Sequence, residues 1–207
     1  MKIICIGRNY AEHAKELKNA IPDQPLVFMK PATALLVQGK DFYYPDFTTD
    51  LHYECELVLK IGKHGRHVQP EFALDYISEV ALGIDFTARD VQQRCKDKGH
   101  PWEIAKAFDH SAPISEFIPF ADLPDPDNIQ FNLTKNESEV QYGQTKLLLF
   151  DFTAIIVYVS KYFKLLQGDY IFTGTPAGVG PVERGDRLRG NLKTKQGWQE
   201  LLRCNVK

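Results

Sequence analysis

Two glutamates and one aspartate are the residues of this sequence best placed for chemistry. Glu54 and Glu56 stand two positions apart in LHYECELVLKIG, residues 51–62, where side chains alternate as in a half-buried β-strand. Side chains at i and i+2 of a strand share one face, so the two carboxylates can converge on a cation and otherwise repel each other. A solvated outer face, balanced by Lys60, is the commoner situation and explains the pair as well.

The position of Asp85 in the sequence favours a functional site over a solvated strand face. It lies near the end of VALGIDF, residues 80–86, an apolar run suited to a buried strand, and a buried carboxylate must be ligated, paired or protonated. A cap on a helix beginning near Thr87, or an ion pair with Arg89, would also satisfy it. Three carboxylates without a well-spaced Cys or His set suit Mg²⁺ or Mn²⁺ rather than Zn²⁺.

A histidine and a lysine could supply proton transfer and charge stabilisation. His13 and Glu16 lie three residues apart on the first expected helix, where a carboxylate can orient an imidazole that acts as a general base. From spacing alone, an ordinary surface pair is the more frequent explanation. Lys106, flanked by apolar residues, can hold its ammonium beside a developing enolate, or it can extend to solvent as such lysines commonly do.

Composition and charge exclude several classes of function. The net charge of -2, with Lys and Arg scattered along 207 residues, offers no basic stripe for nucleic acid and favours a small-molecule partner. The apolar run near the amino terminus, IICI, is too short for a signal peptide or anchor, and we expect no membrane span. The Gly-rich segment 174–180 lacks the lysine of a phosphate-binding loop. Four widely spaced cysteines indicate reduced core residues of a cytoplasmic protein: Cys5, Cys55, Cys95 and Cys204.

The local patterns predict an α+β domain with a rolled or sandwiched sheet and short peripheral helices. No repeat, linker or low-complexity segment divides the chain. Strands are expected over 2–7, 51–62, 80–86 and 170–173, with a hairpin over 129–145 that turns near Asn136 and two more strands in the tail. Helices are expected over 10–20 with Asn9 as cap, over 70–80, over 87–98 with Thr87 and Asp90 in a capping-box-like start and Gly99 at the end, and over 152–166.

Six segments follow one another along most of the chain: GRNYAEHAKE, the KP pair at Lys30, HYECEL, GIDFTARDVQ, KGHPWEIAKAFD and GDYIFTGTPAGVG. The order of these motifs resembles that of the fumarylacetoacetate hydrolase family, and it is closest to the short, single-domain acylpyruvase and oxaloacetate decarboxylase type. The chain departs from the family pattern at the hairpin turn, where Asn136-Glu137 replaces the usual Asn-Gly, and in the Lys- and Arg-rich tail after Gly185.

The resemblance implies a mixed β-roll, a homodimer and one Mg²⁺ or Mn²⁺ per chain held by Glu54, Glu56 and Asp85. It also implies a single catalytic domain, 1–207, in which about residues 1–25 form a strand and a mobile lid helix. By the same matching, the catalytic residues are His13, Glu16 and Lys106, and the pocket is lined by Arg8, Tyr10, Lys30, Arg89, Gln92 and Thr175.

The activity implied by the resemblance is hydrolysis of a carbon–carbon bond in acylpyruvates, with oxaloacetate decarboxylation through a pyruvate enolate held at the metal. Isomerase or tautomerase chemistry, on a 2-hydroxy-dienedioate or on oxaloacetate, is the alternative within enzymes. A non-catalytic protein that retains a dicarboxylate beside a structural cation is the alternative from another class. The pairing of His13 with Glu16 separates the two classes, because a binding protein has no use for a general base.

Overall fold

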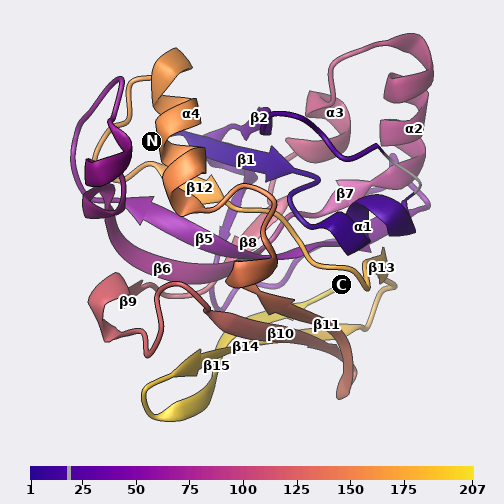
Figure 1. The fold of residues 1–207 in the computed structure, drawn as a ribbon. Helices are drawn as coiled ribbons and strands as arrows, with labels where there is room; N and C mark the ends of the chain where they lie inside the picture. The colour runs from indigo at the N-terminus through magenta and orange to yellow at the C-terminus, as the bar shows by residue number, and fades with distance from the viewer. Residues whose placement is uncertain (18–19) are drawn as a thin grey trace.

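The largest sheet of this computed structural model, which describes residues 1–17 and 20–207, is a curled mixed sheet (Figure 1). β1 lies between β2, which is antiparallel to it, and β12, which is parallel to it, and β12 leads to the long antiparallel pair of β5 and β6. Within the described residues the strands follow the order β2 (Leu26–Lys30), β1 (Ile3–Gly7), β12 (Tyr170–Phe172), β5 (Cys55–Ile61), β6 (Ile77–Ile84), β8 (Ala112–Ile114) and β3 (Leu35–Val37), and β9 (Ile118–Pro119) pairs with β6.

A second sheet packs against one face of the first. Leu57 and Leu82 of the large sheet share one buried cluster with Phe131 and Leu192 of the second sheet, so the main core lies between the two layers. Figure 1 shows this second sheet below the curl of β5 and β6. Its order is β11 (Ser138–Gln144), β10 (Gln130–Lys135), β14 (Arg187–Thr194) and β15 (Gly197–Asn205), and a small third sheet joins β13 (Gly180–Pro181), β4 (Leu51–Tyr53) and β7 (Thr87–Ala88).

The helices are short and peripheral. Figure 1 shows α2 and α3 together on one side of the molecule, near α1, and α4 on the other side. Among the described residues, none of the helices has the length and apolar character that a membrane crossing requires. Their bounds are α1 (Ala11–Glu16), α2 (Arg89–Lys98), α3 (Glu103–Lys106) and α4 (Phe152–Tyr162), and single 3-10 turns cover Ala32–Ala34, Pro70–Phe72, Leu74–Tyr76, Phe120–Asp122 and Thr145–Leu147.

The architecture confirms the predicted α+β class, the hairpin and the paired strands of the tail. The hairpin turns on Asn136 and Glu137, whose φ angles of 50° and 74° are those of a tight two-residue turn. Asn136 stabilises the turn with its side chain, because its Nδ2 donates to Asp186 Oδ1 at 2.6 Å and its Oδ1 accepts from the backbone N–H of Arg187. A tight turn therefore forms without the glycine that usually follows the asparagine.

Three local predictions were wrong. Residues 70–80 form two 3-10 turns and the start of β6 instead of a helix, because Ile77 and Val80 are buried in strand pairing with β5 and β9. This long-range pairing outweighs the local helical pattern. Asn9 does not cap α1, and Thr87 does not cap α2. Thr87 belongs to β7, whereas Gly99 ends α2 with φ 65° as expected.

The first helix is shorter than predicted within the described residues. It begins at Ala11 and ends at Glu16, and the expected extension through residues 18–19 lies outside the described part of the chain. Asn9 is buried and holds the segment before this helix, because its Nδ2 donates to the carbonyls of Phe150 and Thr173 and its Oδ1 accepts from Phe150 N–H. The segment that carries α1 is thus fixed at its start to Phe150, which precedes α4, and to Thr173, which follows β12.

Gly83 offers a test of how tightly the large sheet is packed. A Cβ at this position would lie 2.6 Å from Phe172 Cε1 and 2.9 Å from Val58 Cγ2. We expect Gly83→Ala to lower the free energy of unfolding by roughly 1–3 kcal/mol, because neither side chain has room to move in a close-packed core. Urea unfolding measures this. Ser78→Ala, at an exposed position of the same strand, is the control, and an equal loss in both variants would contradict the packing argument.

Candidate active site

A break between β4 and β5 brings the two glutamates to one site. Glu54 is the residue between the strands, and the side chain of Gln141 fixes the next residue, because its Oε1 accepts from Cys55 N–H at 2.9 Å. Thr175 Oγ1 donates to the carbonyl of Cys55 at 2.8 Å, and Gln141 Nε2 donates to Thr175 Oγ1. Cys55 is therefore clamped on both its backbone groups, so that the carboxylates on either side of it are held in place.

The third carboxylate comes from the end of β6. The backbone N–H of Asp85 donates to the carbonyl of Glu54 at 2.8 Å, which places the two residues side by side. Glu54, Glu56 and Asp85 are only 5%, 2% and 1% exposed, and each offers an oxygen within 4.8 Å of the others. The predicted half-buried strand is therefore wrong, because both of its faces are buried. The solvated-face explanation also fails, since Lys60 pairs with Glu79 instead.

Three cations surround the carboxylates. Lys106 is buried, and its Nζ donates to Glu54 Oε2 at 2.8 Å and to Asp85 Oδ2 at 2.6 Å. Arg89 Nη2 binds the other oxygen of Glu54. Lys30 Nζ lies 2.8 Å from Asp85 Oδ1, although outside hydrogen-bond geometry, and it donates to the carbonyl of Lys106 and to Ser111 Oγ. The expectation that Lys106 extends to solvent is excluded, and the charges of the cluster balance.

The negative charges of the two glutamates are compensated to different extents. Burial by itself raises the pKa of Glu54, but the charges of Lys106 and Arg89 outweigh it and hold that pKa well below its ordinary value. Burial also raises the pKa of Glu56, and the nearby Asp85 and Glu54 raise it further, to well above its ordinary value. The backbone N–H of Gly174, 2.7 Å from Glu56 Oε2, opposes this only in part. Glu56 is thus the carboxylate whose charge is least compensated.

The cluster fits a divalent cation. Its donors are hard carboxylate oxygens from three buried residues, the set that Mg²⁺ and Mn²⁺ prefer. Among the described residues, Asp85 Oδ1 is buried and accepts no hydrogen bond, and a cation between the carboxylates would stabilise the charged form of Glu56. Lys106 binds Glu54 and Asp85, so its ammonium and any cation held at the cluster are attracted to the same carboxylates.

The expected dyad lies beside the carboxylates. His13 is buried, and its Nδ1 is 3.5 Å from Glu16 Oε2, a long contact of the kind that shortens when a site closes on its substrate. Gly178 N–H donates to both oxygens of Glu16 at 3.1 and 3.2 Å, which ties α1 to the Gly-rich loop. Burial, with Arg89 and Lys106, lowers the pKa of His13 below 6.5 against the opposing effects of Glu54 and Glu16. The imidazole is therefore neutral near pH 7 and able to accept a proton.

A narrow cavity is lined by His13 of the dyad and by Glu54 of the three carboxylates. Its volume of about 30 Å³ has room for little more than a water molecule, so a small organic acid binds only if lining side chains or α1 move. Of the pocket residues predicted from the sequence, Arg8, Arg89 and Gln92 line it. Tyr10, Lys30 and Thr175 are buried and are not among its lining residues; Lys30 contacts Asp85, and Thr175 binds the carbonyl of Cys55. The full lining is Gly7, Arg8, His13, Leu17, Phe28, Glu54, Arg89, Gln92, Lys96, Trp102 and Lys106.

Sequence reasoning missed Gln141, Lys96 and Ser111. Gln141 lies in an alternating hairpin strand, where a polar side chain on the apolar face was the only signal. Lys96 could have been found from α2, because Arg89, Gln92 and Lys96 follow a spacing of three and four residues and share one side of the helix. Ser111 carries no local signal, since its contact with Lys30 depends on the fold.

Comparison with known proteins supports a single family. Residues 2–201 match the family model described as fumarylacetoacetate (FAA) hydrolase C-terminal. The chain is 45% identical over 190 residues to "Oxaloacetate tautomerase FAHD1, mitochondrial" of Bos taurus, which covers 92% of this chain and 86% of the relative. It is 42% identical over 189 residues to "Oxaloacetate decarboxylase, mitochondrial" of Dictyostelium discoideum, with 91% and 87% covered.

A solved structure shares the whole fold. The crystal structure of fumarylpyruvate hydrolase from Pseudomonas aeruginosa in complex with Mn²⁺ and pyruvate matches with a TM-score of 0.91 and 38% sequence identity. The match covers 100% of this chain and 89% of that chain.

Lys106 gives a test of the charge balance. We expect Lys106→Met to lower the free energy of unfolding of the metal-free protein by roughly 3 kcal/mol, because Glu54 and Asp85 lose their buried counter-ion. Chemical unfolding in the presence of a chelator measures this loss. Lys98→Met, which removes an exposed lysine from α2, should have little effect. A Lys106 variant as stable as the Lys98 variant would show that the carboxylates do not depend on the ammonium.

Proposed function

The chain belongs to the fumarylacetoacetate hydrolase family, and on this premise we propose that it is a divalent-metal-dependent enzyme that hydrolyses acylpyruvates and decarboxylates oxaloacetate. The observation that carries the proposal is that His13, Glu54 and Lys106 line one cavity, since Glu54 belongs to the buried three-carboxylate cluster and His13 is paired with Glu16. The names of the Dictyostelium and Pseudomonas relatives support the two reactions.

Glu54, Glu56 and Asp85 would hold one Mg²⁺ or Mn²⁺ per chain. A bound ion supplies Lewis-acid stabilisation of negative charge on the oxygen atoms of a 2-oxo acid. Among the residues of the chain, Lys106 directs its ammonium at the same place and can stabilise a developing enolate oxygen. Arg89 Nη1 donates to Gln92 Oε1, and both side chains extend from the start of α2, where they can contact the substrate.

In hydrolysis of an acylpyruvate, His13 is the general base. It accepts a proton from water, and the hydroxide oxygen attacks the distal carbonyl carbon. The bond between that carbon and C3 then breaks, its electron pair passes to the pyruvate enolate, and His13 returns the proton to C3. Glu16 orients the imidazole and stabilises its charged form while it holds the proton. The products are pyruvate and a carboxylic acid.

Oxaloacetate can use the same residues without a water molecule. Its C3–C4 bond breaks with release of CO₂, and the remaining pyruvate enolate takes a proton at C3. Tautomerisation needs still less, because His13 only moves a proton between C3 and the oxygen at C2. This second candidate is favoured by the name of the Bos taurus relative, an oxaloacetate tautomerase, and isomerisation of a 2-hydroxy-dienedioate would use the same transfers.

The remaining expectations are proposals as well. We propose a homodimer, a cytoplasmic location and a lid that includes α1, although β1, within the same amino-terminal stretch, is buried in the sheet. Substrate contacts of Tyr10, Lys30 and Thr175 stay predictions. A non-catalytic dicarboxylate-binding protein remains the alternative of another class.

A panel of substrates tests the activity. We expect the Mg²⁺- or Mn²⁺-loaded chain to turn over acetylpyruvate and oxaloacetate, followed by ultraviolet absorbance, and to lose activity when the metal is removed by a chelator. Enol-oxaloacetate added to the same assay separates tautomerisation from decarboxylation, because only the latter forms CO₂. Absence of turnover with every 2-oxo acid would favour the binding protein.

His13→Ala tests the general base. We expect this variant to lose acylpyruvate hydrolysis by roughly 10²- to 10⁴-fold, the usual contribution of a positioned base, while its affinity for Mn²⁺ stays nearly unchanged. Hydrolysis rates and calorimetric titration with Mn²⁺ measure the two quantities. Loss of the metal together with the activity would overturn the assigned role.

The pH profile tests the protonation state of His13. The imidazole accepts a proton only when neutral, and burial lowers its pKa below 6.5. Activity should therefore be full above that pKa and should fall as the pH drops through it, so that the acid limb of kcat/KM lies below pH 6.5. His100→Gln, at an exposed histidine, should leave the limb in place. A limb above pH 6.5 would contradict this environment.

A further inference from the structure

The cavity carries more positive charge than its own residues neutralise. Four of its lining residues are cations, namely Arg8, Arg89, Lys96 and Lys106, and among the described lining residues Glu54 is the acidic one. Glu54 already binds Arg89 and Lys106. In the described part of the chain, Arg8 and Lys96 form ion pairs with no acidic side chain.

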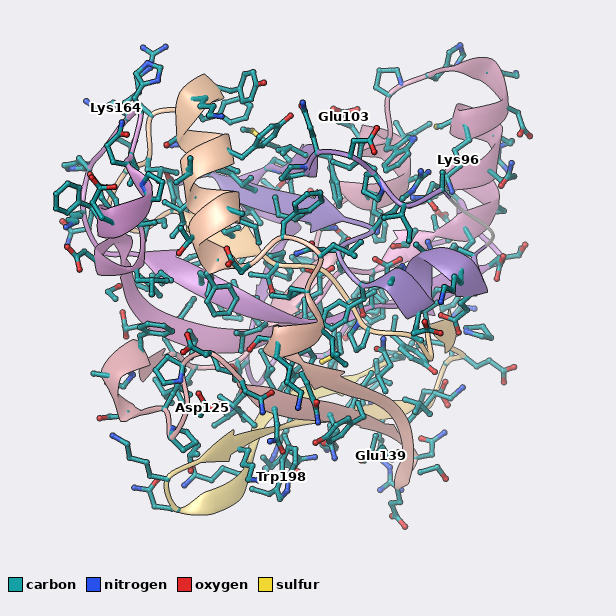
Figure 2. The ribbon with its side chains drawn as sticks, viewed as in Figure 1. Lys96, Glu103, Asp125, Glu139, Lys164 and Trp198 are labelled. Carbon is teal, nitrogen blue, oxygen red and sulfur yellow. The ribbon has the colours of Figure 1, made fainter. Side chains whose placement is uncertain are left out.

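Keeping these two cations together is unfavourable without an anion. Both side chains are half-buried. Burial lowers the pKa of Lys96, and the charges of Arg8, Arg89 and Lys106 lower it further, with Glu54 in opposition. The ring of Trp102, whose centroid is 5.8 Å from Lys96 Nζ, gives only weak compensation. Figure 2 shows Lys96 on the side of α2 that is turned toward the body of the molecule.

The backbone also holds Arg8 in an uncommon conformation. Its φ of 57° lies in the left-handed region, which residues other than glycine rarely adopt. The neighbouring Asn9 maintains this conformation through its buried hydrogen bonds to Phe150 and Thr173. Such strain is maintained where the surrounding structure fixes a side chain in a particular place, and here that place is the cavity.

The distance along α2 suits the far end of a small dicarboxylic acid. Gln92 and Lys96 are four residues apart on one side of the helix, a rise of about 6 Å. Four carbon–carbon bonds of about 1.5 Å each, joined at tetrahedral angles, span about 5 Å in an extended five-carbon acid, and its terminal carboxylate oxygens extend further. An acid whose 2-oxo end lies at Arg89, Gln92 and Lys106 would place a second carboxylate at Lys96.

We propose that Arg8 and Lys96 form a subsite for the second carboxylate of the substrate, so that the enzyme prefers 2-oxo dicarboxylates to 2-oxo monocarboxylates. The proposal rests on the proposed function in one respect, that the 2-oxo acid end binds at the acidic cluster. Lys96 is then a specificity-determining residue that neither the reaction nor the metal requires.

Calorimetry with two acids of five carbons tests the subsite. The Mn²⁺-loaded full chain is titrated with 2-oxoglutarate and with 2-oxopentanoate, which carries a methyl group in place of the second carboxylate. We expect tighter binding of 2-oxoglutarate, and Lys96→Gln should reduce the ratio of the two affinities by about 10-fold or more, as for loss of a charge-assisted hydrogen bond. Lys96→Arg should retain most of the preference.

Two controls separate this role from a structural one. Lys98→Gln removes a neighbouring exposed lysine from α2 and should keep the full preference for 2-oxoglutarate. Lys96→Gln should not lower the melting temperature, because it relieves repulsion within the cavity. A lower melting temperature together with equal loss of affinity for both acids would overturn the proposal in favour of a structural lysine.

The outcomes also distinguish the subsite from the proposed function. An unchanged affinity ratio in Lys96→Gln, or equal binding of both acids by the unsubstituted chain, overturns the subsite even if acetylpyruvate and oxaloacetate are turned over. A preference that depends on Lys96, in a chain that turns over neither substrate, supports the subsite and overturns the proposed function. Binding of neither acid overturns the subsite.

Discussion

Burial of three carboxylates within a few ångströms of one another is the constraint on which the rest of this structure depends. Each carboxylate costs several kcal/mol to remove from water unless a positive charge or hydrogen-bond donors replace the lost hydration. Lys106 and Arg89 do this for Glu54, and Lys106 with Lys30 does it for Asp85. Because these cations come from β2, α2 and α3, the cluster joins elements that are distant in sequence.

The same constraint explains the polar groups that support the site. Cys55, the first residue of β5 after the break at Glu54, lies opposite Ile84 of β6, but its N–H group donates to the side chain of Gln141 and not to a strand. Thr175 binds the carbonyl, so the clamp reaches from the second sheet through the Gly-rich loop to the large sheet. A side chain in one layer thereby fixes the direction of two carboxylates in the other.

The sequence predicted the fold class and the three carboxylates that lie together, but for different reasons. Alternation and turn residues were sufficient for the hairpin of β10 and β11, for the start of α4, which ends at Tyr162 and not at 166, and for the tail strands, because these elements depend on local contacts. The helix expected over 70–80 failed where strand pairing with distant segments decides the structure. For Glu54 and Glu56 spacing alone favoured a solvated face, and only Asp85 and the family motifs pointed to a buried cluster. The supporting contacts of Gln141 and Ser111 could not be predicted, since they exist only after the layers have packed.

Charge compensation also explains which kind of ion each side of the cavity attracts. On one side the carboxylates attract a cation, and Glu56, with its raised pKa, is the residue that such a cation would stabilise most. On the other side Arg8, Arg89 and Lys96 attract an anion. The three carboxylates balance the three cations that contact them, whereas Arg8 and Lys96 add two positive charges and a divalent ion would add two more, so a dianion offsets part of this excess. The same electrostatic argument that buries the cluster therefore favours a metal and a doubly charged acid binding together rather than either one alone.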